Sequence, residues 1–195
     1  MRKLEEKIEI AARSAERLAQ LVATLLDVTR ITSGRYALSP APGDVRELVR
    51  DVTGRWRDAF TRSGTALSVE ADQAIVGRWD ATAVETILNN LLSNALKFGE
   101  GKPVHVALTR DAGWARLVVQ DHGRGIPAAD RTRIFERFER AVPSSHYGGF
   151  GIGLWVVRQI VDALGGAIEV ASEEGDGSTF TVELAVLAPR REDAA

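Results

Sequence analysis

Two asparagines one helical turn apart are the residues of this sequence best suited to hold a metal ion and phosphate. Asn90 and Asn94 are followed, one turn further on, by Lys97. Asparagine is a poor helix former because its amide competes for nearby backbone groups, so this pair carries a cost that needs a reason. Amide oxygens are hard ligands, and two of them beside an ammonium suit hydrated Mg²⁺ and the phosphates that it neutralises. A solvated helix face explains this stretch equally well.

Three glycine-rich stretches follow, which we call the first, second and third glycine segments. In the first, residues 121–126, Asp121 comes directly after an expected strand and is followed by Gly123 and Gly125. Its carboxylate can accept from the exocyclic amine of a purine, and the glycines let backbone and base approach closely. An ordinary Asp-x-Gly turn is the simpler explanation of this segment taken alone.

The second and third glycine segments are residues 148–153 and 175–180. The second precedes an expected helix, so its N–H groups and the helix dipole favour a bound phosphate. Glycine before a helix is also found in plain loops. The third is most simply a hairpin turn, and a packing role beneath a nucleotide is the weaker alternative.

The periodicity of the chain predicts the elements that position these segments. Val84, Ile87, Leu88 and Leu91 recur at the helical period and predict a core-facing helix that begins at the N-cap Asp80. Asp44 is the expected cap of another helix, which ends near residue 60. Further helices are expected at 130–138 and 151–164, a chain break at 40–43, and strands at 65–70, 75–79, 104–110, 114–120, 167–171 and 179–186. The fold class is therefore α+β, with a mixed sheet covered by helices on one face.

A long amphipathic helix is expected before this domain. From Leu4 to Ile31 the apolar residues alternate at spacings of three and four, which favours a helical bundle over an ordinary core helix. Because so apolar a stripe is unstable in water, we expect self-association through it, and hence a homodimer. The expected boundaries are 1–35 for this helix, 36–188 for the domain and 189–195 for a disordered tail.

The composition excludes several classes of function. The 195 residues carry a net charge of −2, so no basic field recruits nucleic acid or an acidic membrane. The sequence has no cysteine, which removes disulfides, thiolate metal sites and cysteine nucleophiles. No apolar run reaches transmembrane length, and a cytoplasmic location without membrane contact is the expectation.

Five motifs, in order and spacing, resemble the N box, first glycine box, F box, second glycine box and third glycine box of bacterial sensor histidine kinases. They lie at 90–98, 121–126, 134–138, 149–154 and 175–180. The resemblance implies an α/β sandwich shared with gyrase-type and chaperone ATPases, which binds Mg-ATP and passes the γ-phosphate to histidine. Residues 8–29 are similar to the second helix of the family's dimerisation bundle. The implied partners are a histidine-bearing bundle helix and the receiver domain of a response regulator.

The resemblance also implies roles for individual residues. Asp121 would read the adenine amine, Asn90 and Asn94 would hold Mg²⁺ and phosphate oxygens, and Lys97 would meet a phosphate. Arg140 would reach the γ-phosphate from a lid over about 139–149, although a bare arginine on a loop is otherwise solvated. The remaining implied nucleotide contacts are Phe98, Gly123, Gly125, Ile126, Gly149, Gly151, Ile152, Gly153, Leu154 and Thr179.

One departure from the family concerns the phosphoacceptor. The only histidines are His105, His122 and His146, and none has the family's acceptor context, so packing or loop roles are expected for them. Autophosphorylation of this chain alone is therefore not expected. Three alternatives stay open: an ATPase or ATP-driven clamp of the same superfamily, an anti-sigma-type serine kinase, and a degenerate binding module.

Overall fold

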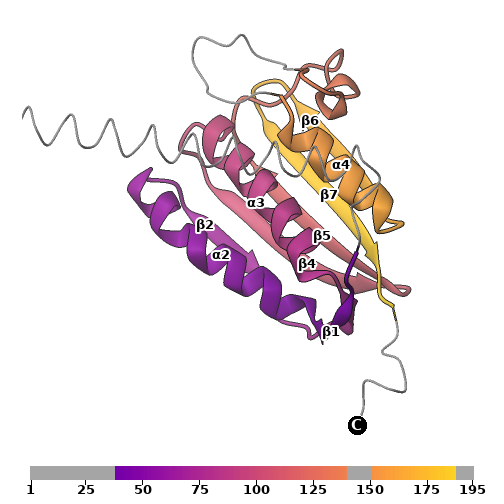
Figure 1. The fold of residues 1–195 in the computed structure, drawn as a ribbon. Helices are drawn as coiled ribbons and strands as arrows, with labels where there is room; N and C mark the ends of the chain where they lie inside the picture. The colour runs from indigo at the N-terminus through magenta and orange to yellow at the C-terminus, as the bar shows by residue number, and fades with distance from the viewer. Residues whose placement is uncertain (1–37, 140–150, 188–195) are drawn as a thin grey trace, which may run out of the picture. The chain divides into compact units, whose positions relative to one another are not determined.

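The computed structural model describes residues 38–139 and 151–187 (Figure 1). All of them belong to the second of two compact units of the chain, Ala37–Ala195. The expected bundle helix, the tail and residues 140–150, which include Arg140, His146 and Gly149, lie outside the described residues. Among the helices that are described, none is long and apolar enough to cross a membrane.

A five-stranded mixed sheet forms the base of the domain, in the order β2-β4-β5-β7-β6. β2 runs parallel to β4, and the other neighbours are antiparallel. A small second sheet pairs β1 with β3. The strands are β1 (Ala41–Asp44), β2 (Leu67–Glu70), β3 (Val76–Trp79), β4 (Val104–Asp111), β5 (Trp114–Asp121), β6 (Ala167–Glu173) and β7 (Gly177–Ala185).

Three helices cover one face of this sheet: α2 (Val45–Arg62), α3 (Ala81–Phe98) and α4 (Gly153–Ala163) (Figure 1). Residues that point toward them, such as Val106, Leu117 and Val182, are buried, and their neighbours along each strand are half-buried or exposed. This alternation is the mark of a sheet with one dry face and one wet face. The expected α+β class is therefore confirmed, with helices on one side of a mixed sheet.

α3 runs between α2 and α4 and carries the centre of the core (Figure 1). Its apolar stripe, including Ile87, Leu88 and Leu92, has no exposed surface. Asp80 caps the helix as expected and accepts a hydrogen bond from the backbone N–H of Ala83 at 2.9 Å. The neighbouring Asn89 accepts from the indole of Trp56 at 2.8 Å, which fixes α3 to α2.

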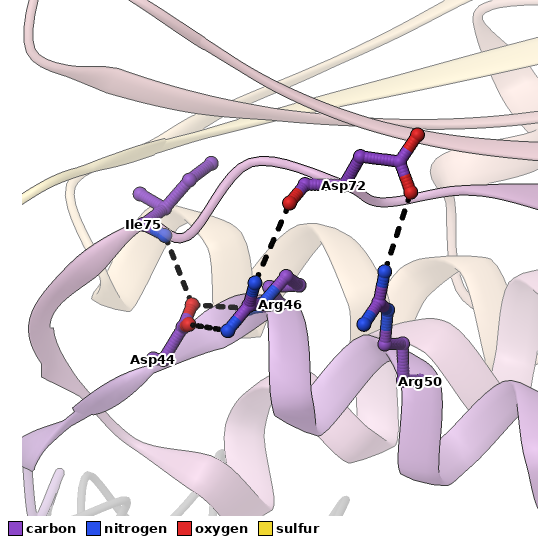
Figure 2. Close-up of polar contacts among 5 residues, drawn as sticks. All are labelled: Asp44, Arg46, Arg50, Asp72 and Ile75. Carbon is purple, nitrogen blue, oxygen red and sulfur yellow. Dashed lines mark hydrogen bonds and ion pairs between the residues drawn. The ribbon is translucent and has the colours of Figure 1, made fainter.

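The start of α2 is held by a cluster of charges (Figure 2). Asp44 accepts from the backbone N–H groups of Arg46 at 3.0 Å and Ile75 at 2.9 Å, and its other oxygen pairs with the Arg46 guanidinium at 2.9 Å. Arg46 also donates to the carbonyl of Asp72, and Arg50 pairs with the carboxylate of Asp72 at 3.3 Å. The cap of α2 thereby also holds the loop between β2 and β3.

Two expectations about local structure are wrong. Residues 41–44 form β1 rather than a break, because β1 is an edge strand in which Pro42 has no ladder bond to lose. The helix expected at 130–138 is only a 3₁₀ turn at Arg133–Phe135. Ile134 is its one buried residue and Phe138 is 66% exposed, so no apolar stripe holds a longer helix.

Candidate functional site

The first asparagine of α3 lies against the start of α4. Its Nδ2 donates to the carbonyl of Thr86 at 2.8 Å, which leaves Oδ1 on the other side of the amide. A Cβ added at Gly153 would lie 2.6 Å from that Oδ1. The structure therefore brings Asn90 and the second glycine segment together, and glycine at 153 leaves room for the amide oxygen.

Asn94 is half-buried, and its side-chain amide makes no hydrogen bond to any residue in the described part of the chain. Its amide is therefore available to a ligand, unlike that of Asn89. Lys97, one turn on, is exposed, and Phe98 is half-buried. The described residues contain no cluster of three acidic or histidine side chains that could hold a metal. Two amide oxygens fit a Mg²⁺ that keeps its other ligands from water and phosphate, as this ion usually does.

Asp121 lies at the end of β5 and is 6% exposed. Its carboxylate accepts from the backbone N–H of Gly123 at 2.9 Å. Burial raises the pKa of Asp121 above its ordinary value, and the N–H groups of Gly123 and Ser178, which favour the ionised form, partly offset this effect. The result is a buried acceptor held by backbone donors, as recognition of a base amine requires.

The glycines of the first segment allow contacts that no other residue permits. A Cβ at Gly123 would lie 2.0 Å from the carbonyl oxygen of Phe98, at the end of α3. Gly125 has a φ of +68°, and its Cβ would meet the carbonyl of Glu173. The loop is thus pressed between the end of α3 and the hairpin that joins β6 to β7.

The third glycine segment is the hairpin that the sequence predicted, and it packs directly on the first. Gly175 donates to the carbonyl of Arg124 at 2.7 Å, and a Cβ at Gly177 would lie 2.1 Å from the carbonyl oxygen of Asp121. Thr179 pairs with Gln120 on the sheet face turned away from the helices, so the structure does not bring it beside Asp121. A contact of Thr179 with a nucleotide stays a prediction.

Two buried serines near Asp121 were not found from the sequence. Ser172 is 7% exposed and Ser178 is 6% exposed, and their hydroxyls lie 3.0 Å apart. Ser172 also accepts from the backbone N–H of Ile126 at 2.8 Å and donates to the carbonyl of Gly177 at 2.7 Å. The available signal was strand alternation, which places both serines on the covered face of the sheet, where a hydroxyl is unusual.

The second glycine segment is described only from Gly151. That residue has a φ of +67°, Ile152 is buried, and the half-buried Leu154 lies in the first turn of α4. The N–H of Phe138 donates to the carbonyl of Gly151 at 3.0 Å, and the Arg137 guanidinium lies 4.7 Å from the centre of the Trp155 ring. The end of the 134–138 motif is therefore held against the start of α4.

Both described histidines have contacts within the fold. His105 faces the open side of the sheet, with Nδ1 3.0 Å from the hydroxyl of Ser68 and Nε2 3.7 Å from Glu70. The Nδ1 of His122 lies 3.0 Å from the carbonyl oxygen of Pro103. These contacts agree with the packing and loop roles expected for them.

A pocket of about 200 Å³ lies at the N-terminal end of α3. Trp79, Asp80, Val84 and Leu164 are among its lining residues. None of the predicted site residues lines this pocket.

Comparison with known proteins gives a consistent result. Residues 79–188 match the family described as histidine kinase-, DNA gyrase B- and HSP90-like ATPase. The chain is 32% identical over 197 residues to the autoinducer 2 sensor kinase/phosphatase LuxQ of Vibrio cholerae, covering 97% of this chain and 23% of that protein. It is 32% identical over 190 residues to the sensor-like histidine kinase SenX3 of Mycobacterium tuberculosis, covering 96% of this chain and 46% of that protein.

Solved structures show the same likeness. Full-length ShkA in complex with AMPPNP has a TM-score of 0.77 and 30% identity, covering 91% of this chain and 38% of that one. The mycobacterial sensor histidine kinase MprB has a TM-score of 0.66 and 30% identity, covering 77% of this chain and 100% of that one. The chain spans less than half the length of the curated relatives named above.

Proposed function

We propose a function from one premise: this chain belongs to the histidine kinase-, DNA gyrase B- and HSP90-like ATPases, as a catalytic ATP-binding domain of the sensor histidine kinase type. The proposal is that the chain binds Mg-ATP and transfers the γ-phosphate to a histidine of a dimerisation bundle. The transfer would serve two-component signal transduction. One observation supports this proposal above the others: the end of α3, the first glycine segment and the β6–β7 hairpin are joined by short backbone contacts around the Asp121 carboxylate.

The base would bind at Asp121. The carboxylate accepts from the amine of adenine, while Gly123 and Gly125 keep the adjacent backbone free of side chains. The N–H groups that hold the carboxylate keep it in place as an acceptor. The AMPPNP bound to ShkA supports an adenine nucleotide as the ligand of this fold.

The phosphates would bind along α3 and at the start of α4. Asn90 and Asn94 present amide oxygens to Mg²⁺, which supplies positive charge that neutralises the phosphates when it is bound. Lys97 adds an ammonium, and we propose the same for the Arg140 guanidinium, which lies outside the described residues. Gly153 leaves the N-terminus of α4 open, where N–H groups and the helix dipole favour anions.

The α3 side chains favour transfer over hydrolysis. A hydrolytic enzyme needs a general base for water, and an amide such as that of Asn90 cannot take a proton at neutral pH. The carboxylate nearest to it on this helix, Glu85, pairs with Arg55 of α2 at 3.2 Å. We therefore expect slow ATP turnover and transfer to an imidazole, which is itself a nucleophile.

The acceptor and the further partners belong to the same proposal. Because none of the three histidines of the sequence has the family's acceptor context, the phosphorylated imidazole would come from a separate bundle helix. We propose that the N-terminal helix pairs with that helix in a homodimer, and that a response-regulator receiver domain takes the phosphate onward.

The test is incubation of the chain with Mg-ATP and a separate histidine-bearing bundle. We expect a phosphoprotein that is stable in base and labile in acid, as phosphohistidine is, together with little free phosphate. Asn94→Ala should abolish the transfer. Asn89→Ala is the matched control. The side chain of this asparagine, on the same helix, bonds to Trp56 of α2 and is not a predicted site residue, so transfer should persist.

Brisk phosphate release without transfer would contradict the kinase proposal and favour the ATPase of the same superfamily. Transfer to a serine, recognised by an acid-stable product, would favour the serine kinase. A chain that binds no nucleotide would favour the degenerate module.

A further inference from the structure

The hydroxyl of Ser172 connects two parts of the base-binding region. Ser172 lies in β6, is 7% exposed, and uses all of its hydrogen-bonding capacity inside the protein. A hydroxyl has one hydrogen and two lone pairs. The hydrogen goes to the carbonyl of Gly177 at 2.7 Å, one lone pair accepts from the N–H of Ile126 at 2.8 Å, and the Ser178 hydroxyl, 3.0 Å away, must be the second donor.

One arm of this network leads to Asp121. The carbonyl of Gly177 belongs to the same peptide unit as the N–H of Ser178, and that N–H acts on the Asp121 carboxylate. The Ser172 hydroxyl therefore fixes the orientation of a peptide whose other end faces the base-reading group. Gly177 itself lies against the backbone of Asp121, where an added Cβ would be 2.1 Å from the Asp121 carbonyl oxygen, so a change in the orientation of this peptide acts directly on Asp121.

The other arm leads to the end of the first glycine segment. The N–H of Ile126 would be a partly buried donor without a partner if Ser172 did not accept from it. Gly125 next to it lies against the carbonyl of Glu173, the residue that follows Ser172. The two arms thus hold both ends of the segment that starts at Asp121.

We infer that Ser172 is a positioning residue for adenine recognition: its hydroxyl sets the geometry of Asp121 and Ile126 and thereby the preference of the site for an adenine nucleotide. This inference rests on the proposed function and deepens it. Ser172 does not contact the nucleotide, so its removal should alter which base is preferred rather than the hold on the phosphates.

The test compares ATP with ITP, in which a carbonyl replaces the amine that Asp121 would read. Calorimetry with Mg²⁺ gives both dissociation constants for the wild-type chain and for Ser172→Ala. We expect Ser172→Ala to weaken ATP binding about tenfold and ITP binding by less than about threefold, because only the base contact loses its geometry. The preference for ATP would then fall, which a merely destabilised fold would not produce.

Ser63→Ala is the matched control. The hydroxyl of Ser63 also bonds a backbone carbonyl and a second hydroxyl, those of Phe60 and Thr65, at the end of α2. We expect it to leave both dissociation constants unchanged. If Ser172→Ala does not fold, Ser172→Cys keeps the volume with a weaker donor and should lower the preference for ATP in the same direction.

The outcomes separate this inference from the proposed function. A wild-type chain that binds neither nucleotide would overturn the proposed function, and this inference with it. Two outcomes would overturn the role of Ser172 and leave the proposed function standing. One is a preference for ATP that is unchanged in Ser172→Ala and Ser172→Cys, and the other is an equal loss of affinity for ATP and ITP.

Discussion

Two aspartates of this domain, Asp44 and Asp121, differ in their hydrogen-bond partners and in their burial. Asp44, at the start of α2, receives two backbone N–H groups and a guanidinium, so both of its oxygens serve the fold (Figure 2). Asp121, at the end of β5, is more deeply buried and is held by backbone donors without a cation among its hydrogen-bond partners in the described chain.

The surroundings differ in the same way. Around Asp44, the long side chains of Arg46 and Arg50 pair with the carboxylates of Asp44 and Asp72, so charge neutralises charge. Around Asp121, glycines let backbone pack against backbone. A Cβ added at Gly123, Gly125 or Gly177 would lie less than 3 Å from a backbone atom. The first region joins charged side chains to one another, whereas the second holds a buried carboxylate with backbone donors. Replacement of Asp44 should therefore damage stability, whereas replacement of Asp121 should, under the proposed function, damage binding.

The largest effect should come from adding one methyl group to the Asp121 region. Gly123→Ala would place Cβ against the carbonyl of Phe98 and the Cα of Gly99, both backbone atoms, and should lower the free energy of unfolding by about 3 kcal/mol or more. In the α2 region, Gly54→Ala meets nothing within 4 Å and should raise it by about 0.5–1 kcal/mol through helix propensity. Urea denaturation measures both, and similar values would contradict the difference in packing.

The next largest effects come from replacing each of the two aspartates in turn. Asp121→Asn should weaken ATP binding by about 1.5–3 kcal/mol, because a neutral amide replaces a charge-assisted acceptor. Asp44→Ala should lower the free energy of unfolding by about 2 kcal/mol through the lost helix cap and the lost bond to Ile75, and leave ATP affinity nearly unchanged. Calorimetry measures the ATP affinity of both variants, and urea denaturation measures their free energy of unfolding. Equal ATP affinity in Asp121→Asn would remove Asp121 from the base site.

The smallest effect is a pH dependence that belongs to Asp121. Because burial raises its pKa in the folded state, the folded chain binds the proton more readily than the unfolded chain. Stability from this group is therefore full below the ordinary carboxyl pKa and is lost as pH rises through the raised one. As the pH falls from neutrality toward the ordinary carboxyl pKa, the wild-type chain should gain stability relative to Asp121→Asn. A difference that stays constant over this range would show that the carboxylate is not desolvated.

The sequence predicted the elements whose signals are local. Asp44 and Asp80 were identified as N-caps, and the apolar period of α3 placed that helix correctly. β1 was missed because its proline-rich sequence is acceptable only at a sheet edge, which depends on its partner β3. The helix expected at 130–138 is only a short turn, because Ile134 alone is buried in it and no apolar stripe holds a longer helix.

The site followed the same rule. Asp121 and its glycines were identified because carboxylate and glycine chemistry is visible in one segment. Ser172 and Ser178 were missed because their place beside Asp121 comes from the register of β7 against both β5 and β6, which puts Ser178 opposite Asp121 and Ser172. Local sequence does not encode that register, so neither serine was identified from it.

The strand order has a consequence for how the domain is made. β4 and β5 form a local hairpin, whereas the other edge of β5 pairs with β7, which follows after a long stretch of chain. During synthesis from the N-terminus, β5 therefore waits with one edge unpaired until β7 has emerged. Closing so long a loop costs entropy before any contact compensates it, so we expect this pairing to form late in folding. The newborn chain would therefore expose a strand prone to pairing with other chains, and Asp121 with it, until β7 arrives.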